Sequence, residues 1–270
     1  MRLTPENENI KIRYNNSMIA YPHINPEIVR IGPFAVRWYG MMYLIGFASS
    51  YLLVKYQIGQ EKKKEVVDHL YTYLILGLLI GARLGYVVFY NFSFYLQHPL
   101  EIFAVWHGGM SFHGGLIGSF FAGFLFCKKF GLDFLHTADL VIVTAPIGIG
   151  FGRLGNFING ELYGRITDVP WAMIFPSGGQ LSRHPSQLYE LFLEGIILFI
   201  VLWTLRGRFK PGVLSSLFLI LYGVFRFVVE FFREPDVQIG YVLGIFTMGQ
   251  VLCVSMLLAG VFLLYLLKKT

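Results

Sequence analysis

Charged residues are scarce in this sequence. Only 14% of its 270 residues are Asp, Glu, Lys or Arg, whereas soluble proteins carry about a quarter. Hydrophobic residues make up 55% of the chain, and its mean hydropathy is +0.59. This composition excludes an ordinary soluble protein and predicts a chain whose solvent is largely lipid.

Cysteine is also scarce, and no metal-binding motif is present. Cys127 and Cys253 both lie in apolar runs and are too few for a disulfide framework, so we interpret them as small core residues. The sequence has no HExxH motif, no DxDxDG motif and no Cys/His cluster. We therefore expect neither a metal nor a cofactor.

The net charge of +6 does not indicate nucleic-acid binding, because the lysines lie in short clusters between hydrophobic segments, where they orient helices. Residues 1–17 are polar and lack the apolar stretch of a cleavable signal peptide. We expect 1–17 to be an N-terminal extension and 18–270 to form a single membrane-embedded domain.

The predicted fold is all-α and polytopic. A spanning helix needs about 20 mostly apolar residues. Seven windows satisfy this requirement: 34–55, 66–90, 111–127, 134–151, 186–205, 212–232 and 241–267.

Lys and Arg residues alternate along the connections between these windows. The connection 91–110 contains neither residue, whereas the connections before and after it are basic. Basic connections face the cytoplasm, which predicts the N-terminus outside and the C-terminus inside. Four residues weakly oppose this orientation: Arg2, Lys11, Arg13 and Arg30.

Two external segments are longer than simple turns. Residues 91–106 are aromatic and nearly uncharged, so we expect an amphipathic arm on the membrane surface. Residues 152–185 are predicted to form a long Gly-rich loop, and long loops are often functional.

The window 212–232 and its end carry polar residues that are costly in a membrane. Tyr222, Arg226, Glu230 and Arg233 follow at steps of four, four and three, which predicts one helical face. One interpretation is an Arg226–Glu230 pair that joins helices, although it leaves Arg233 unexplained. The other interpretation is a binding site.

The predicted orientation places Arg226 about 15 residues from the cytoplasmic end of its helix, or roughly 22 Å deep. Arg153 is then expected at the outer end of its span, and His113 at the outer start of another. These three groups, from three helices, are therefore predicted to converge near the outer leaflet.

Two arginines at headgroup depth favour a phosphate ligand, because guanidinium binds phosphate with a planar fork of donors. His113 could accept a proton there. Glu161 and Glu230 could orient the arginines or act as the base instead, and Asn156 and Asn159 could bond ester or glycerol oxygens.

The glycines around His113 read H-G-G-M-S-F-H-G-G-L-I-G. Gly114 and Gly118 form GxxxG, which predicts close helix packing in a membrane. No GK[ST] follows, which excludes a P-loop, and Ser111 lacks the G-x-S-x-G context of a serine hydrolase.

Five separated motifs resemble those of the prolipoprotein diacylglyceryl transferase family, and the match covers essentially everything after Met18. The run G-R-L-G-N-F-I-N-G-E-L-Y-G-R, from Gly152 to Arg165, is the most specific. The other motifs are R-W-Y-G at Arg37–Gly40, S-F-H-G-G-L-I-G at Ser111–Gly118, H-P-S-Q-L-Y-E at His184–Glu190 and Y-G-V-F-R-F-V-V-E-F-F-R at Tyr222–Arg233.

The resemblance implies an enzyme that transfers the diacylglyceryl group of phosphatidylglycerol to the lipobox cysteine of a prolipoprotein signal peptide. The products are a thioether-linked lipid and glycerol 1-phosphate. It also implies a seven-spanning protein of the bacterial inner membrane, surrounded by membrane lipids, with its active site facing the outer leaflet or periplasm.

The same resemblance implies roles for individual residues. Arg153 and Arg226 would hold the headgroup phosphate, with Asn156 and Glu161 around it, while Tyr39 and Tyr222 would line the site. His113 is the first candidate for the base, and Glu230, Glu161 and the lipid phosphate remain alternatives. The alternative function is a transporter or channel for an anionic solute, although we find no internal repeat to support it.

Overall fold

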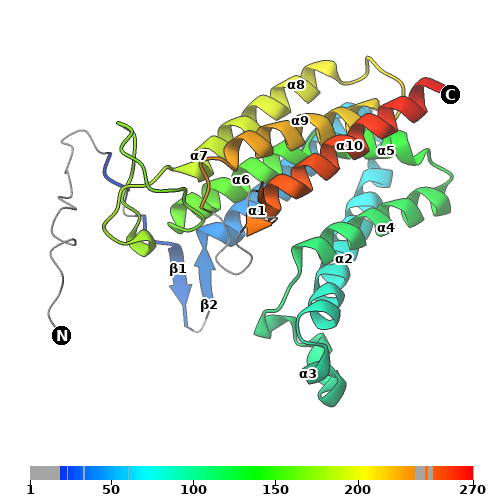
Figure 1. Ribbon diagram of the computed structural model, residues 1–270. Coiled ribbons are helices and arrows are strands. Elements are labelled where there is room, and N and C mark those ends of the chain that lie inside the picture. The colour runs from blue at the N-terminus through cyan, green and yellow to red at the C-terminus, as the bar shows by residue number, and fades with distance from the viewer. Residues whose placement is uncertain are drawn as a thin grey trace, which may run out of the picture.

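The protein is a bundle of long helices. The computed structural model describes residues 19–22, 24–32, 34–59, 61–234, 241–242 and 246–269. Helix α1 (Trp38–Ile58) packs on α6 (Ala145–Ile158), and α9 (Val213–Val229) packs on α10 (Met248–Lys269). The pair α2 (Glu61–Phe89) and α4 (Phe112–Phe130) diverges from this bundle (Figure 1).

Each of the seven predicted windows contains a helix. Among the described residues, four helices are long and apolar enough to cross a membrane: Glu65–Phe89, Phe134–Ile158, Ser186–Leu205 and Met248–Lys269. Val213–Val229 is a shorter apolar helix. The chain is therefore a polytopic membrane protein. The predicted extension 1–17 lies outside the described residues.

Two predicted windows began too early. Residues Phe34–Arg37 form strand β2, paired antiparallel with β1 (Glu27–Ile31). Strands β3 (Tyr241–Val242) and β4 (Phe246–Thr247) pair before α10 begins. Apolar β-branched and aromatic residues suit strands as well as helices, so hydropathy alone did not separate the two.

Two of the membrane segments are interrupted. Helix α5 (Phe134–Ile142) is followed by α6, with Pro146 at the start of the new helix. Proline there loses no helical hydrogen bond, because the first N–H groups of a helix have no partner within it. The segment 186–205 comprises α7 (Ser186–Glu190), the π-helix η5 (Leu191–Ile197) and α8 (Leu198–Leu205).

Glycines bring α2 and α4 into direct backbone contact. A Cβ on Gly118 would lie 2.1 Å from the carbonyl oxygen of Gly77, and one on Gly114 would lie 2.3 Å from that of Gly81. The predicted GxxxG packing is thus confirmed, and its partner surface is a second glycine series in α2. No larger residue fits at these positions without separating the helices.

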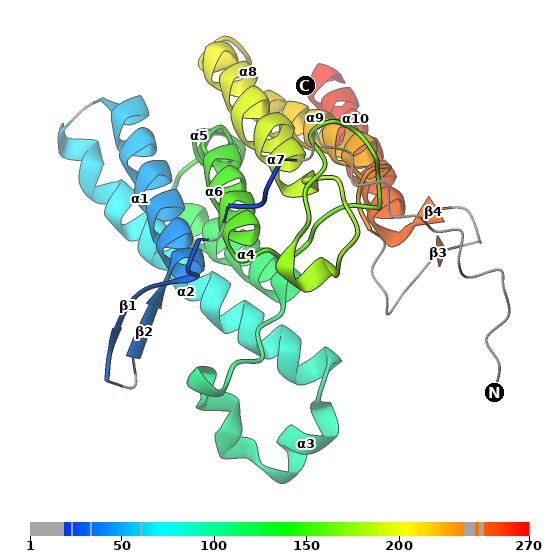
Figure 2. The same cartoon turned by 90° about the vertical axis from the view of Figure 1, so that its left-hand side faces the viewer.

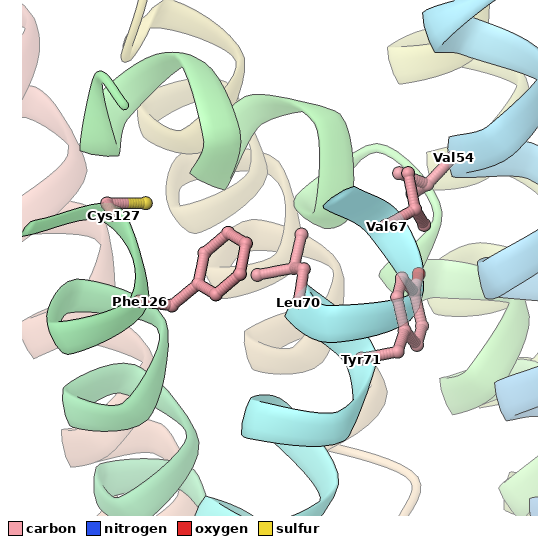
Figure 3. Packing of buried hydrophobic residues seen from close by; sticks show 6 residues of the cluster. All are labelled: Val54, Val67, Leu70, Tyr71, Phe126 and Cys127. Atoms are coloured by element: carbon pink, nitrogen blue, oxygen red, sulfur yellow. The ribbon is translucent and has the colours of Figure 1, made fainter. Parts of the chain in front are cut away.

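One apolar core joins α1, α2 and α4. Its buried members are Val54, Val67, Leu70, Tyr71, Phe126 and Cys127, as Figure 3 shows. Cys127 is buried and free, and so is Cys253 in α10, which confirms that both cysteines are core residues.

The segment after α2 forms an arm that projects from the bundle (Figure 2). It contains helix α3 (Phe92–Gln97) and two 3₁₀ turns, η2 (Pro99–Phe103) and η3 (Val105–His107). The buried Arg83 of α2 donates hydrogen bonds to the carbonyl oxygens of Glu101, Ile102, Ala104, Gly108 and Gly109. Arg83 therefore fixes the arm to the bundle, while Phe103 and Trp106 remain exposed.

The external loop begins later than predicted, because α6 continues to Ile158. Arg153 and Asn156 consequently lie on a helix instead of in the loop. Tyr21 joins the loop to α6: its ring packs against Phe175 of the loop, with centroids 5.1 Å apart, and its hydroxyl is shared between the carbonyl oxygens of Phe157 (2.6 Å) and Ile158 (3.0 Å). Burial raises the pKa of Tyr21, so this hydroxyl stays a donor.

Candidate active site

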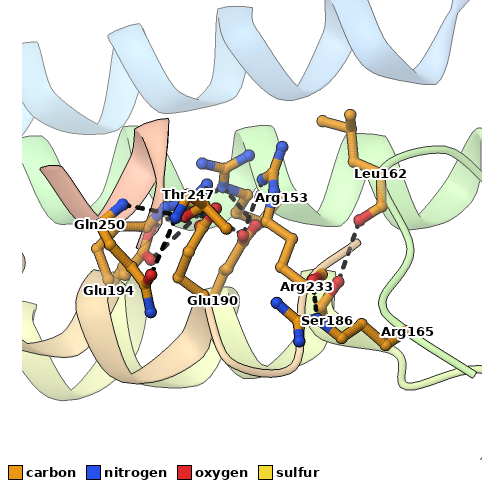
Figure 4. Close-up of polar contacts among 11 residues, drawn as sticks. Arg153, Leu162, Arg165, Ser186, Glu190, Glu194, Arg233, Thr247 and Gln250 are labelled. Carbon is orange, nitrogen blue, oxygen red and sulfur yellow. Dashed lines mark hydrogen bonds and ion pairs between the residues drawn. The ribbon is translucent and has the colours of Figure 1, made fainter. Parts of the chain in front are cut away.

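A buried carboxylate joins two of the predicted arginines. Glu190, at the end of α7, pairs with Nε of Arg153 on α6 at 2.8 Å. It also pairs with Nη1 of Arg226 on α9 and, at 3.1 Å, with Nη1 of Arg233. Figure 4 shows Arg153, Arg233 and Glu190 converging. We call Arg153, Glu190, Glu194, Arg226, Glu230 and Arg233 the charged cluster.

The predicted Arg226–Glu230 pair is confirmed, with Nη2 of Arg226 3.2 Å from Oε2 of Glu230. Glu230 also accepts a hydrogen bond from the hydroxyl of Thr247 at 3.0 Å. Thr247 and Gln250 form a capping box at the start of α10: the backbone N–H of each donates a hydrogen bond to the side-chain oxygen of the other. Glu230 therefore lies at a capped helix N-terminus. A negative charge is stabilised there.

Helix α9 ends at Val229, so the predicted single helical face of Tyr222, Arg226, Glu230 and Arg233 stops short of Arg233. Arg233 instead lies in an isolated bridge with Gly164 of the external loop. An Arg226–Glu230 pair alone left Arg233 without an explanation. The ion pair of Arg233 with Glu190 supplies one.

Glu194 is the third carboxylate near the two arginines. Its side chain is 0% exposed, and its oxygens lie 3.7 Å from Nη1 of Arg226 and 4.0 Å from Nε of Arg153. Neither oxygen accepts a hydrogen bond from any described residue. It projects from η5, and π-helical turns often occur at functional sites.

A second group of predicted residues lies at the outer end of α6. Asn156 and Asn159 donate hydrogen bonds to Oε1 of Glu161 at 2.9 Å and 3.2 Å. Tyr39 of α1 packs against Gly155 and interacts electrostatically with Glu161. We call Tyr39, Asn156, Asn159 and Glu161 the amide group.

The amide group and the charged cluster are continuous. Arg153 and Asn156 are three residues apart on α6, which places them on one side of the helix. The buried Gln187 and Ser186 of α7 donate hydrogen bonds to the carbonyl oxygens of Glu161 (2.7 Å) and Leu162 (3.1 Å). These bonds tie the loop to the helix that carries Glu190.

His113 lies apart from both groups. It is exposed at the start of α4, which packs mainly on α2, and its ring lies against Phe112. Within the described part of the chain, no hydrogen bond or ion pair joins His113 to the arginines. The predicted convergence is therefore seen for Arg153 and Arg226, whereas His113 makes no direct contact with them.

Tyr222 lies one turn before Arg226 on α9 and stacks on Phe218, with ring centroids 5.6 Å apart. It belongs to the apolar core between α8 and α9 and interacts electrostatically with Glu194 and Arg226. Tyr222 thus borders the charged cluster.

Sequence reasoning missed Glu190 and Glu194 as site residues. Both carboxyl groups fall in the window 186–205, where a charge is costly, and they are four residues apart. That spacing was a usable signal, and Glu190 also closes the motif H-P-S-Q-L-Y-E. Their partners could not be deduced, because these come from other helices.

An apolar groove of about 600 Å³ runs between α1, α6 and the segment η5–α8. Leu154 and Leu191 line it next to Arg153 and Glu190, and Ser49 contributes the polar hydroxyl of its lining. The groove therefore lies along the same helical segments that carry the partly buried Arg153 and the buried Glu190. In the described residues, no group of His, Cys, Asp and Glu is arranged to hold a metal.

Comparison with known proteins matches this chain to one family. The family model described as prolipoprotein diacylglyceryl transferase matches residues 26–266. The chain is 54% identical to the phosphatidylglycerol–prolipoprotein diacylglyceryl transferase of Desulfotalea psychrophila over 254 residues, covering 90% of this chain and 93% of that protein. It is 50% identical to the protein of the same name from Geobacter sulfurreducens, covering 92% and 97%.

Proposed function

The chain belongs to the prolipoprotein diacylglyceryl transferase family, and we propose that it transfers the diacylglyceryl group of phosphatidylglycerol to a prolipoprotein cysteine. In this reaction the thiol sulfur bonds to the glyceryl carbon, and the bond between that carbon and the phosphate oxygen breaks. The thiol loses its proton, and glycerol 1-phosphate leaves with the bonding electron pair.

The convergence of Arg153 and Arg226 on one buried carboxylate carries this proposal. Among the described contacts of the Arg153 side chain, the ion pairs use only Nε, so its two terminal amino groups can face a phosphate. Developing negative charge on the leaving phosphate is stabilised by such preorganised donors. Asn156 follows Arg153 by one turn of α6, and we infer that the amides of Asn156 and Asn159 donate to ester or glycerol oxygens, while Glu161 holds these two amides.

We propose His113 as the first candidate for the acceptor of the thiol proton, with Glu161, Glu230 and the lipid phosphate as alternatives. Glu161 accepts hydrogen bonds from two asparagines, and Glu230 pairs with Arg226 and Thr247. The imidazole of His113 is exposed and forms no hydrogen bond with the described residues, so it is open to a substrate.

The apolar groove supports a lipid donor. Leu154 of α6 and Leu191, the first residue of η5, line it and directly follow Arg153 and Glu190 in the sequence, so we infer that an acyl chain in the groove would leave its headgroup near these charged residues. Tyr39 lies against Gly155 of α6, and Tyr222 lies one turn before Arg226 on α9, so we infer that both tyrosines border the headgroup site.

We further propose seven membrane spans, with the N-terminus outside and the C-terminus in the cytoplasm of a bacterial inner membrane. The position of Lys268 and Lys269 in the last turn of α10, and of Lys128 and Lys129 in the last turn of α4, supports this orientation. The site then faces the outer leaflet, where a translocated signal peptide is available.

The direct test uses purified protein, phosphatidylglycerol and a peptide that carries a lipobox cysteine. We expect the peptide to gain a diacylglyceryl mass with stoichiometric release of glycerol phosphate, and a Cys→Ser peptide to gain none. Folded, lipid-bound protein that produces no mass gain would overturn the proposal and favour transport of an anionic solute.

Two arginine substitutions distinguish loss of phosphate binding from a general effect of removing an arginine. Arg226→Ala should abolish transfer. It removes the guanidinium group that is proposed to bind the phosphate, and this group is also one of the ion-pair partners of Glu190. Arg208→Ala, in the exposed connection between α8 and α9, is the matched control and should keep it. Full activity in a well-folded Arg226→Ala protein would contradict the assigned role.

A further inference from the structure

The charged cluster contains as many carboxylates as guanidinium groups. Arg153, Arg226 and Arg233 face Glu190, Glu194 and Glu230 through ion pairs of 4.0 Å or less. All six charges lie in segments that pack inside the bundle. With every group ionised, the cluster is neutral, which is the state that burial favours.

The three carboxylates differ in how they are stabilised. Glu190 forms close ion pairs with three arginines, and Glu230 has Arg226 and the hydroxyl of Thr247. Glu194 has only the two longer ion contacts, and neither of its oxygens accepts a hydrogen bond within the described chain. Its negative charge therefore depends most on the arginines that the substrate is proposed to use.

A phosphodiester bound at Arg153 and Arg226 adds one negative charge to this buried region. The guanidinium charge is then shared with the phosphate, and Glu194 loses compensation that no hydrogen bond replaces. An isolated ionised carboxylate is strongly disfavoured away from water, whereas a protonated one is not. The least costly way to restore neutrality is to protonate the carboxylate with the fewest donors.

We propose that Glu194 takes up one proton when an anionic phospholipid headgroup binds at Arg153 and Arg226. The proton comes from solvent and forms an O–H bond on the Glu194 carboxyl group, and no bond of the lipid changes in this step. The inference rests on the proposed function, because it assigns the phosphate site to the same two arginines. Glu194 is a positioning residue here, since it acts on the lipid through the arginines.

The groups that face Glu194 do not offer an equal proton site. Glu190 precedes it on α7, Arg226 and Tyr222 face it from α9, and Arg153 faces it from α6. Cys253 of α10 interacts with it electrostatically. Tyr222 and Cys253 carry their protons already at neutral pH. Glu190 keeps three close arginine contacts, and Glu230 keeps its hydroxyl donor.

The sign of the resulting pH dependence follows from linkage. Since the lipid-bound protein holds one more proton than the free protein, rising pH must weaken lipid binding. Over the pH range in which free Glu194 is ionised and lipid-bound Glu194 is protonated, affinity for phosphatidylglycerol should fall by up to about tenfold per pH unit. Glu194→Gln carries a permanently neutral group of the same shape, so this dependence should disappear.

Calorimetric titration of the wild-type protein tests the proposal without any substitution. Phosphatidylglycerol in mixed micelles is titrated in two buffers of different ionisation enthalpy, and the difference in heat reports the protons taken up. We expect an uptake that approaches about one proton per bound lipid where the free carboxyl group is ionised and the lipid-bound one is protonated. Diacylglycerol, which lacks the phosphate, should cause none. Absence of uptake with phosphatidylglycerol overturns the proposal.

Two variants identify the group. Glu194→Gln should bind phosphatidylglycerol without proton uptake. Glu234→Gln changes an exposed carboxylate that pairs with Arg183 outside the charged cluster, so it should retain the uptake per bound lipid. Equal uptake in the wild type and in Glu194→Gln assigns the proton elsewhere and overturns the proposal. The same preparation is assayed with the lipobox peptide: transfer without proton uptake refutes only this inference, whereas tight binding without transfer refutes the proposed function.

Discussion

The side chain of Asp139 caps a helix to which it does not belong, through Ser215. Asp139 lies on α5, and its Oδ1 accepts hydrogen bonds from the backbone N (2.8 Å) and the hydroxyl (2.6 Å) of Ser215 in the first turn of α9. Its Oδ2 accepts a third from the backbone N of Gly212 at 2.7 Å. This contact sets where α9 begins, and α9 carries Arg226.

Replacing Asp139 with Ala should therefore destabilise the fold. Three donors at the start of α9 lose a charged acceptor, which corresponds to about 2 kcal/mol or more for a lost cap with buried donors. Thermal unfolding in detergent should show a lower midpoint than the wild type. Asp139→Asn retains an acceptor oxygen for Ser215 and should lose less. An unchanged midpoint in Asp139→Ala would refute the cap.

Glu190 is predicted to be indispensable to the site. Its removal leaves three partly buried guanidinium groups without their shared partner, and breaking one buried pair alone costs about 3–5 kcal/mol. Glu190→Ala should lower both the yield of folded protein and lipid binding. The matched control is Glu234→Gln, which changes an exposed carboxylate paired with Arg183 and should behave like the wild type. Wild-type lipid affinity in Glu190→Ala would contradict the prediction.

The contact between α2 and α4 should tolerate no methyl group at Gly118. A Cβ there meets the carbonyl oxygen of Gly77 at 2.1 Å, and a backbone atom cannot move aside. Gly118→Ala should lower the unfolding temperature sharply. In Gly123→Ala the new Cβ meets only the side chain of Leu74 at 3.4 Å, so this variant of the same helix should unfold nearly as the wild type does. Equal unfolding temperatures of the two variants would contradict the backbone contact.

The protein is predicted to lose stability in mild acid because His184 is partly buried. His184 lies in the external loop against Tyr189 and Phe232, and burial lowers the pKa of its imidazole below the usual value. The unfolded chain then binds the proton more strongly, so stability is full above about pH 6.5 and falls as pH drops from there towards the folded pKa. Unfolding midpoints measured across this range should show the fall in the wild type and less of it in His184→Gln. Identical pH dependence in both proteins would exclude His184 as the cause.

The sequence predicted that Arg153, Arg226 and His113 lie at a similar depth, and the structure shows which of them meet. Arg153 and Arg226 both pair with Glu190. His113 contacts neither arginine, because α4 follows α2 away from the bundle, where Gly77, Gly81, Gly114 and Gly118 join those two backbones. Spacing along each helix indicated depth in the membrane, but it carried no information on which helices are neighbours.

Membrane character and the segments that carry the helices were determined by the sequence alone, because the length and hydropathy of each apolar run are local properties that the bilayer selects directly. The partners of the buried charges were decided only by the tertiary structure. Glu190 acquires its role from arginines on α6, on α9 and beyond the end of α9. Glu194 acquires its role from two ion contacts of 3.7 Å and 4.0 Å, with no hydrogen bond to its oxygens from the described residues. Such pairings depend on how separate helices pack, which hydropathy and spacing do not encode.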